Sequence, residues 1–443
     1  MRSKVLAATI LGSVLVFLDG TIVNVLLPAL RREFSLSLGQ AQWVTQAYLL
    51  FLSALLLLGG SLGDHLGRKR IYQIGILVFT ASSFACALAP NFGFLIAARA
   101  LQGVGGALLT PGSLAIINAV FPKEDRGKAI GTWASFTTLA SAAGPVVGGL
   151  LVDHFSWRWA FAFNLPYAVA SWHLTRVAVP ESCSEQHSAP LDFLGAGLAS
   201  LSFFGMTLGL MQGSAPIGLV SILLFAVFLS HERRAKAPMI PLELFRGRTF
   251  SAVNLLTFFV YGALGIVFFM LPFQLIEVGG FSAWQAGAAG FPFIAAVFAM
   301  SRVAGALLDR CGPLLPLTTG PLIAGGGMIL LRKMAVPHAS YAEAYLFPML
   351  IFGIGMALTI TPLTTTVMAA AGESYSGVAS GINNAVARLS ALLAIAALPI
   401  FVTQVYGIPF RVDLECYRAA LSFAAGLAFV GAVCGGFSRR DVK

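Results

Sequence analysis

The sequence predicts an all-α integral membrane protein built from two six-helix halves with two extra spans between them. The first observation is composition: the 443 residues are 58% hydrophobic and only 10% charged, whereas about a quarter of the residues in soluble domains are charged. The second is that apolar residues form long continuous runs, which indicates spanning helices and not barrel strands. The third is a glycine and aspartate motif found once in each half, which indicates an internal duplication.

About 14 apolar runs approach the ~20 residues that a bilayer requires. We expect spans at 5–30, 41–61, 71–90, 94–120, 128–153, 156–178, 193–212, 216–230, 251–276, 283–308, 314–331, 343–369, 376–404 and 413–436. The seventh and eighth runs form a hairpin, so removing both leaves the topology unchanged. The expected division is an N-terminal six-helix bundle (1–178), two extra spans with a cytoplasmic linker (179–250) and a C-terminal six-helix bundle (251–443).

Basic residues predict the orientation of the chain. The first apolar run continues past Asp19 with no small-residue cleavage site, so we interpret it as a retained span and not a signal peptide. Lys and Arg favour the segments that this topology places inside, such as 68–70 and 123–128, although Arg31 and Arg32 count against it. We expect a multi-pass protein of the inner (plasma) membrane with both termini in the cytoplasm.

The remaining composition excludes several function classes. The net charge of +10 is scattered among short loops, which suits topology and anionic lipid better than nucleic acid. The five cysteines and six histidines form no paired or metal-type spacing, so we expect no disulfide, metal or other cofactor. Phosphate-loop, zinc-protease and nucleophile-elbow motifs are absent from the sequence. We therefore expect no enzyme; uphill transport would draw on an ion gradient or another subunit.

A short charged loop follows the second span. Gly60, Asp64 and Gly67 fit the spacing Gly-x-Leu-x-Asp-x-x-Gly, and Arg68 follows directly. The glycines let two helix ends approach closely, and Asp64 can pair with an Arg or with a helix N-terminus.

The second copy of this motif spans 305–312 and contains Asp309 and Arg310. Ordinary basic loops are the alternative interpretation. The repeated spacing of glycine and aspartate favours a shared motif, and hence a transporter built from two related halves.

The first span carries Asp19, Thr21, Asn24 and Pro28. A carboxylate deep in an apolar helix is costly unless it faces a cavity or a partner, so Asp19 is a functional candidate. Burial makes a carboxylate harder to keep ionised, which suits a group that binds and releases protons. A purely structural, hydrogen-bonding aspartate is the alternative.

The fourth span carries Arg99 and Gln102, followed by several glycines that allow close helix contact. Arg99 lies at a depth similar to that of Asp19, so its permanent charge could tune the aspartate or pair with it in one conformation. Alternatively, Arg99 pairs structurally with a backbone carbonyl or a distant carboxylate.

The fifth span carries Gly144, Pro145, Gly148 and Gly149. Pro145 removes a backbone donor and favours a kink, while the glycines make a flat face. Such a helix could flex as two halves rock, but a plain packing face explains the pattern equally well.

Polar residues inside the expected spans are candidates for the lining of a substrate cavity. They are Asn24, Gln102, Asn383, Asn384 and Arg388. The 35 Phe and 11 Met residues could add an adaptable apolar lining, although most of them must face lipid or other helices.

With these motifs, the chain resembles the major facilitator superfamily, specifically its 14-span EmrB/QacA-type drug/proton antiporters. The resemblance covers essentially the whole chain, and it rests on the stretches 18–28, 60–70, 99–105, 144–149 and 156–166. His65 departs from the pattern, because the family usually has Arg there.

The resemblance implies a major facilitator fold and proton-coupled efflux of lipophilic, often cationic drugs by alternating access. Asp19 would be the proton site and Arg99 its coupling partner, while Asp64 and Arg68 would make contacts in only one state. Small-molecule substrate would bind between the halves. Further candidate partners are membrane lipid, a periplasmic adaptor and an outer-membrane channel.

Two other functions remain open from the sequence. One is proton-coupled export or uptake of a specific metabolite or siderophore on the same fold. The other, from a different class, is a receptor or regulator, which would usually carry an extra soluble domain that is not visible in this sequence.

Overall fold

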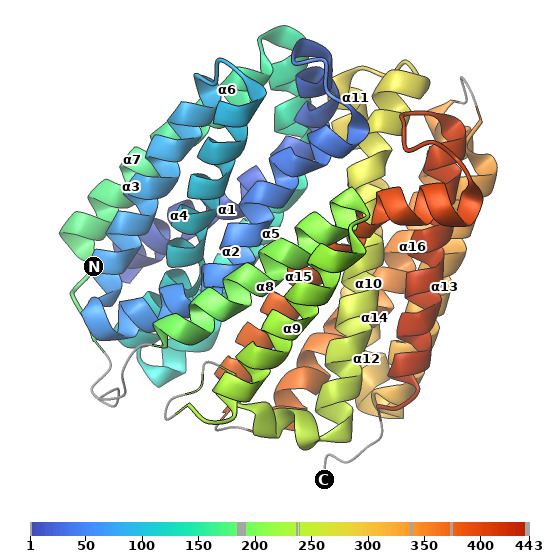
Figure 1. Cartoon of the computed structure of the whole chain (residues 1–443). Helices are drawn as coiled ribbons and strands as arrows, with labels where there is room; N and C mark the ends of the chain where they lie inside the picture. Colours follow the sequence, from blue (N-terminus) through green and yellow to red (C-terminus); the bar gives the residue numbers. More distant parts are fainter. Residues whose placement is uncertain are drawn as a thin grey trace. The chain divides into compact units, whose positions relative to one another are not determined.

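The computed structural model describes residues 2–183, 192–235, 238, 240–336, 340–372 and 375–438, so parts of the expected linker at 179–250 lie outside the described residues. The described residues are helical apart from their connections, as the sequence predicts (Figure 1). The helices are α1 (Arg2–Glu33), α2 (Leu38–Leu66), α3 (Arg68–Ala87), α4 (Phe92–Val120), α5 (Lys123–His154), α6 (Trp157–Ala162), α7 (Asn164–Ala178), α8 (Phe193–Gln212), α9 (Ala215–Glu232), α10 (Arg248–Phe273), α11 (Ala283–Ala288), α12 (Phe291–Cys311), α13 (Leu314–Met334), α14 (Phe347–Ala371), α15 (Ser376–Ile400) and α16 (Leu414–Gly435).

The described residues also contain short helical turns of other kinds. A 3-10 turn, η1 (Leu242–Arg246), precedes α10. Three π-turns continue or precede long helices: η2 (Gln274–Val278), η3 (Ala342–Leu346) and η5 (Phe401–Val405).

The number of spans is close to the expected 14. Among the described residues, 12 helices are long and apolar enough to cross a membrane, and 13 if the bent helix α2 is counted. The run expected at 156–178 forms two shorter helices, α6 and α7, on either side of Phe163. Pro166 has no N–H to donate to the carbonyl of Ala162, four residues earlier, so it fits the first turn of a new helix better than the interior of a continuous one.

The chain divides by its contacts into two compact units. The first consists of Met1–Gly205, Leu219–Met239 and Ser282–Gly287, and the second of Met206–Gly218, Ile240–Phe281 and Ala288–Lys443. In the first unit α1 packs on α4, α5 and α7, while α4 also packs on α2 and α3. In the second unit α10 packs on α14, α15 and α16, while α14 also packs on α12 and α13. The same packing order in both units is what an internal duplication produces.

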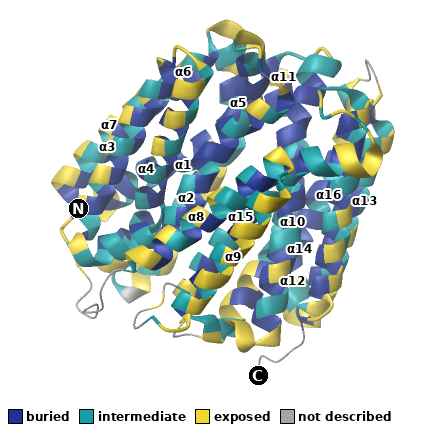
Figure 2. Cartoon of the chain, in the orientation of Figure 1, coloured by how far each residue is buried: buried dark blue, intermediate teal, exposed yellow. Residues whose placement is uncertain are grey.

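The exposed surface is rich in apolar side chains. Figure 2 shows exposed residues along α9 and on parts of α8. In α9 the side chains of Leu219, Val220, Ile222, Leu223 and Val227 are all more than half exposed. A helix that is apolar on every side suits contact with lipid, not with water.

Candidate functional site

A buried ion pair joins the first and fourth helices of the first unit. Asp19 Oδ2 lies 2.6 Å from Arg99 Nη1, and the two side chains are 0% and 1% exposed. The sequence placed these residues at a similar depth, and the packing of α1 on α4 brings them into direct contact. A fully desolvated pair of this kind requires well-placed hydrogen bonds to compensate its lost hydration.

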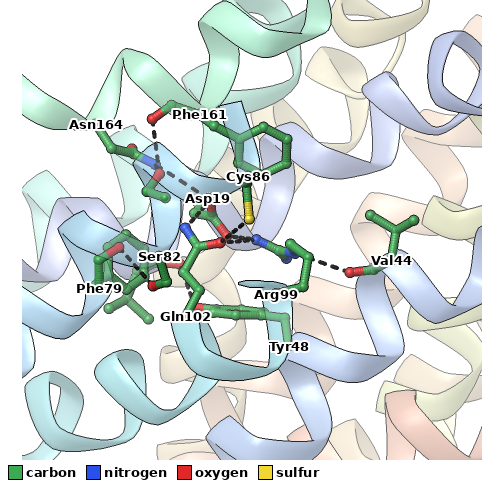
Figure 3. Close-up of polar contacts among 12 residues, drawn as sticks. Asp19, Val44, Tyr48, Phe79, Ser82, Cys86, Arg99, Gln102, Phe161 and Asn164 are labelled. Atoms are coloured by element: carbon green, nitrogen blue, oxygen red, sulfur yellow. Dashed lines mark hydrogen bonds and ion pairs between the residues drawn. The ribbon is translucent and has the colours of Figure 1, made fainter. Parts of the chain in front are cut away.

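Gln102 supplies such hydrogen bonds from the same face of α4 as Arg99, three residues later. Its Nε2 donates to Asp19 Oδ1 at 2.9 Å, and its Oε1 accepts from Arg99 Nη1 at 2.6 Å. The carboxamide therefore bridges the two charges, as Figure 3 shows. The thiol of Cys86 on α3 also lies against Gln102 Oε1, at 3.7 Å.

The guanidinium of Arg99 is held by α2 and by an aromatic ring on α6. Its Nε donates to the carbonyl of Val44 at 3.0 Å. The ring of Tyr48 lies 4.4 Å from the Arg99 Cζ atom and the ring of Phe161 5.6 Å away. Ring faces attract a cation most strongly where water is excluded, so these contacts help to keep a permanent charge inside the bundle.

Asn164, the first residue of α7, completes the cluster around Asp19. Its Nδ2 lies 3.4 Å from Asp19 Oδ1 and 3.1 Å from the hydroxyl oxygen of Ser83 on α3. Ser83 in turn donates to the carbonyl of Phe161 at 2.9 Å. The break between α6 and α7 thus places the Asn164 side chain and a backbone carbonyl beside the ion pair (Figure 3).

Glycines in α4 let the surrounding helices approach closely enough to form this cluster. A Cβ at Gly103 would overlap the carbonyl oxygen of Tyr48 on α2, and one at Gly105 would overlap the backbone of Phe79 on α3. Backbone-to-backbone packing at these two positions draws the turn that carries Arg99 into the bundle.

The predicted loop motif between α2 and α3 forms a compact charged turn. Arg68 binds the Asp64 carboxylate through Nε at 2.8 Å and Nη2 at 2.7 Å. Gly67 joins the helices at a φ of +107°, a conformation that side chains rarely adopt. Gly60 lies one turn before Asp64 on α2 and packs on Pro111 of α4.

Glu181, which follows α7, caps the start of α3 in this loop. Its carboxylate accepts from the backbone N–H groups of Lys69 at 3.0 Å and Arg70 at 3.2 Å. A negative charge at a helix N-terminus is favourable, because it meets unsatisfied N–H groups and the positive end of the helix dipole. Glu181 therefore fastens the end of α7 to the charged turn.

The second copy of the motif has the backbone turn without the charge pair. Gly312 has a φ of +74° and ends α12. Asp309 and Arg310 are both exposed, and neither side chain forms an ion pair within the described part of the chain. The duplicated sequence motif therefore differs in its electrostatics between the two units.

The glycine face of α5 serves close packing on two sides. A Cβ at Gly144 or Gly148 would overlap Thr21 or Ile22 of α1, respectively. A Cβ at Gly149 would overlap the backbone of residues 283–284, which belong by their contacts to the first unit. Helix α5 remains a continuous helix through Pro145.

Asp153 binds the same segment beyond the glycine face. Its carboxylate oxygens accept from the backbone N–H groups of Ala283 at 3.0 Å and Trp284 at 2.8 Å. The contact fastens the start of α11 to the end of α5.

The five polar cavity candidates do not form one cluster within either unit. Gln102 belongs to the ion-pair cluster, whereas Asn24 is half-buried and lies roughly 140° around α1 from Asp19. In the second unit Asn383 donates to Thr257 Oγ1 at 2.7 Å. The two other candidates, Asn384 and Arg388, are exposed and half-buried on α15, respectively.

Several residues of these clusters were not among the predicted site residues. Asn164 could have been noticed as an amide inside an expected span, and Glu181 as an acid directly after one. Tyr48 and Ser83 carry no such signal, because a tyrosine or serine in a spanning helix is ordinary. Only the packing of helices shows which of them face a charge.

Comparisons with known proteins agree with this architecture. The family model described as Major Facilitator Superfamily matches residues 9–395. The multidrug resistance protein Stp of Mycobacterium tuberculosis is 34% identical, with 89% of this chain and 74% of that protein covered. The riboflavin transporter RibZ of Clostridioides difficile is 28% identical, with 98% of this chain and 97% of that protein covered.

A solved structure shows the same fold. It is a bacterial homologue of the human lysosomal transporter Spinster, with a TM-score of 0.72 and 18% identity over 100% of this chain and 97% of that one. The repeated packing order, the membrane-spanning helices and the family match lead to one conclusion: the chain belongs to the major facilitator superfamily and is a membrane transporter of that type.

Proposed function

We propose that this transporter exports lipophilic, cationic compounds in exchange for protons, and that Asp19 is its proton site. The observation that carries the proposal is the Asp19–Arg99 pair, which is fully buried in a bundle of apolar helices. Ionisable side chains inside membrane segments are rare and costly, and they mark proton or ion pathways in transporters.

The buried pair offers a physical means of coupling. Protonation neutralises Asp19 and leaves the Arg99 charge without its counter-ion. Removing one partner of a buried ion pair costs about 3–5 kcal/mol, so a conformation that gives Arg99 another partner or more water becomes favoured. Proton and cargo then compete through a shared conformational equilibrium, which is the thermodynamic requirement for exchange.

The direction and the cargo class draw support from the relatives. The similarity to a protein named for multidrug resistance favours export of foreign compounds. Membership in the 14-span EmrB/QacA-type branch is part of the proposal, as are placement in the inner membrane and gating by the Asp64–Arg68 pair. A periplasmic adaptor and an outer-membrane channel would be needed only if cargo must cross a second membrane.

A specific metabolite is the second candidate cargo. The observation that favours it is the similarity to a riboflavin transporter, which extends over nearly the full length of both chains. The proton site proposed at Asp19 serves either cargo, because it lies within one bundle and uses residues of the first unit alone.

Reconstituted transporter can distinguish the two cargoes. Purified protein in liposomes would face an imposed proton gradient while the movement of ethidium, tetraphenylphosphonium and riboflavin is followed separately. Gradient-driven movement of both cations supports the proposal. Movement of riboflavin with no movement of either cation would replace the drug proposal with the metabolite one.

A further inference from the structure

The surroundings of Asp19 contain hydrogen-bond donors and one unused acceptor. Its oxygens accept from Arg99 Nη1, Gln102 Nε2 and Asn164 Nδ2. This donor set suits an ionised carboxylate. The unused acceptor is Asn164 Oδ1, which is buried and has no hydrogen-bond partner. Buried amide oxygens are normally paired, so an orphaned one beside a carboxylate needs an explanation.

A protonated Asp19 would need an acceptor, because its new O–H is a donor in a site without water-exposed atoms. Arg99 carries no acceptor. Gln102 Oε1 is already engaged by the Arg99 guanidinium and lies against the Cys86 thiol. Of the carboxamide groups in contact with Asp19, only Asn164 has an acceptor that is not yet used.

From this geometry we infer that Asn164 is the positioning residue for the protonated state of Asp19. This inference rests on the proposed function, in which Asp19 binds the transported proton. When a proton binds an Asp19 oxygen, the Asn164 amide turns about its last side-chain bond, and Oδ1 takes the place of Nδ2. The O–H of Asp19 then donates to Asn164 Oδ1, while the proton itself stays on Asp19.

The exchange of the two amide atoms is geometrically modest. Nδ2 lies 3.4 Å from Asp19 Oδ1, a weak contact for a donor and a carboxylate. The last torsion of an asparagine side chain is broad, so a half-turn requires no change of backbone or of the first torsion. A single amide can therefore donate to the ionised carboxylate and accept from the neutral acid.

Ser83 can follow the same turn. Its hydroxyl oxygen now accepts from Asn164 Nδ2 at 3.1 Å, and its proton is directed to the carbonyl of Phe161. A hydroxyl can redirect its proton by rotation, so Ser83 could donate to Asn164 Oδ1 after the turn. Both lone pairs of that oxygen would then be used.

The other groups that face Asp19 and its partners are few. They are Arg99 and Gln102 on α4, Tyr48 on α2 and Cys86 on α3. Gln102 is also an amide, but its Oε1 accepts from Arg99 Nη1, so turning it toward Asp19 would break that bond; the other three side chains have no amide to turn. Asn164 should therefore be the neighbour of Asp19 whose removal disfavours the protonated form of that carboxyl group.

Infrared titration of the purified full-length protein tests this inference. The C=O band of a protonated carboxyl group would be followed with pH, and the part belonging to Asp19 identified by its loss in Asp19→Asn. In Asn164→Leu the protonated form loses its acceptor, so we expect the midpoint of that band to move to lower pH by about one unit or more. Ser82→Ala is the matched control, because the Ser82 hydroxyl bonds only within its own helix.

The outcomes separate the inference from the function on which it rests. If Asn164 serves only as a donor to the carboxylate, its removal moves the midpoint to higher pH, and this result or an unmoved midpoint overturns the inference alone. If Asp19→Asn removes no titrating band, the proposed proton site fails as well. Should Asn164→Leu not fold, Asn164→Ala is expected to show the same direction with a smaller shift.

Discussion

Three corresponding helices in each unit carry a cluster of buried polar side chains, but only the cluster in the first unit contains charged residues. In the first unit Asp19 on α1, Arg99 on α4 and Asn164 on α7 surround an ion pair. In the second unit the corresponding helices are α10, α14 and α16, the first continued by η2 and the second preceded by η3. Their buried polar side chains include Gln274, Tyr345 and Tyr417, all neutral.

The neutral cluster is also less completely bonded. Gln274 Nε2 lies 3.4 Å from the hydroxyl oxygen of Tyr345, while Gln274 Oε1 and the Tyr417 hydroxyl are buried without a partner. Duplication thus explains why the two units share one helix packing, but it does not explain why only the first unit carries a buried ion pair. A desolvated ion pair is costly to maintain, and its presence in one unit only agrees with a proton site there.

The largest expected effect is on the ion pair. Arg99→Leu leaves an ionised Asp19 buried without its counter-charge, so we expect a loss of about 3–5 kcal/mol in the free energy of unfolding. Adding Asp19→Asn should restore much of this loss, because the uncompensated charge disappears. Denaturant unfolding of the purified single and double variants measures the coupling; additive effects of the two substitutions would contradict a direct pair.

Glycine packing should be equally important in both units. Gly105 on α4 meets the backbone of Phe79 on α3, and Gly327 on α13 meets the backbone of Phe352 on α14. Valine at either position would force these helices apart, at a cost of about 1–3 kcal/mol. Thermal unfolding of Gly105→Val and Gly327→Val should show similar losses, with Gly326→Ala as a control where a Cβ meets open space. Strongly unequal losses of stability in the two variants would show that the two units do not share this glycine packing.

In the neutral cluster of the second unit, we expect a substitution that does not lower the stability of the protein. Tyr417→Phe removes a buried hydroxyl that has no partner, and the desolvation penalty of such a group is about 1–3 kcal/mol. We therefore expect this variant to be at least as stable as the original protein, whereas Gln102→Leu in the charged cluster should destabilise it. A clear loss of stability in Tyr417→Phe would mean that its hydroxyl is bonded after all.

The two loop motifs should differ in transport more than in stability. Asp64 is paired with Arg68 and partly exposed, so Asp64→Asn should change the unfolding free energy by less than about 1 kcal/mol. The transport rate of Asp64→Asn should fall if the pair of Asp64 with Arg68 forms in only one conformation. Asp309→Asn is the natural comparison, because Asp309 is exposed in the second copy; equal rate losses in both would remove the distinction between the loops.

The sequence was informative wherever a residue type is unusual for its surroundings. Continuous apolar runs identified the helices, and the charge in the first and fourth spans identified Asp19 and Arg99. The sequence was less informative about which faces of the helices pack against each other. The role of Gln102 as a bridge depends on its lying three residues from Arg99 on a face that packs against α1.

Backbone details were also beyond the sequence patterns. The run at 156–178 is divided at Phe163, and this break brings Asn164 to Asp19. The copied motif at 305–312 shares a positive-φ glycine turn with 60–70 and lacks the ion pair, because Pro313 stands at the position that Arg68 occupies in the first copy. Helix α5 continues without a break through Pro145.

Proton movement in liposomes tests the central claim most directly. Internal pH would be followed by fluorescence while ethidium is added to liposomes that contain the original protein, Asp19→Asn or Glu33→Gln. Glu33 is a suitable control, because it lies on the same helix and pairs with Arg158 at the partly exposed end of α1. The account predicts ethidium-dependent proton movement in the original protein and in Glu33→Gln, and none in Asp19→Asn. Undiminished proton movement in folded Asp19→Asn would contradict it.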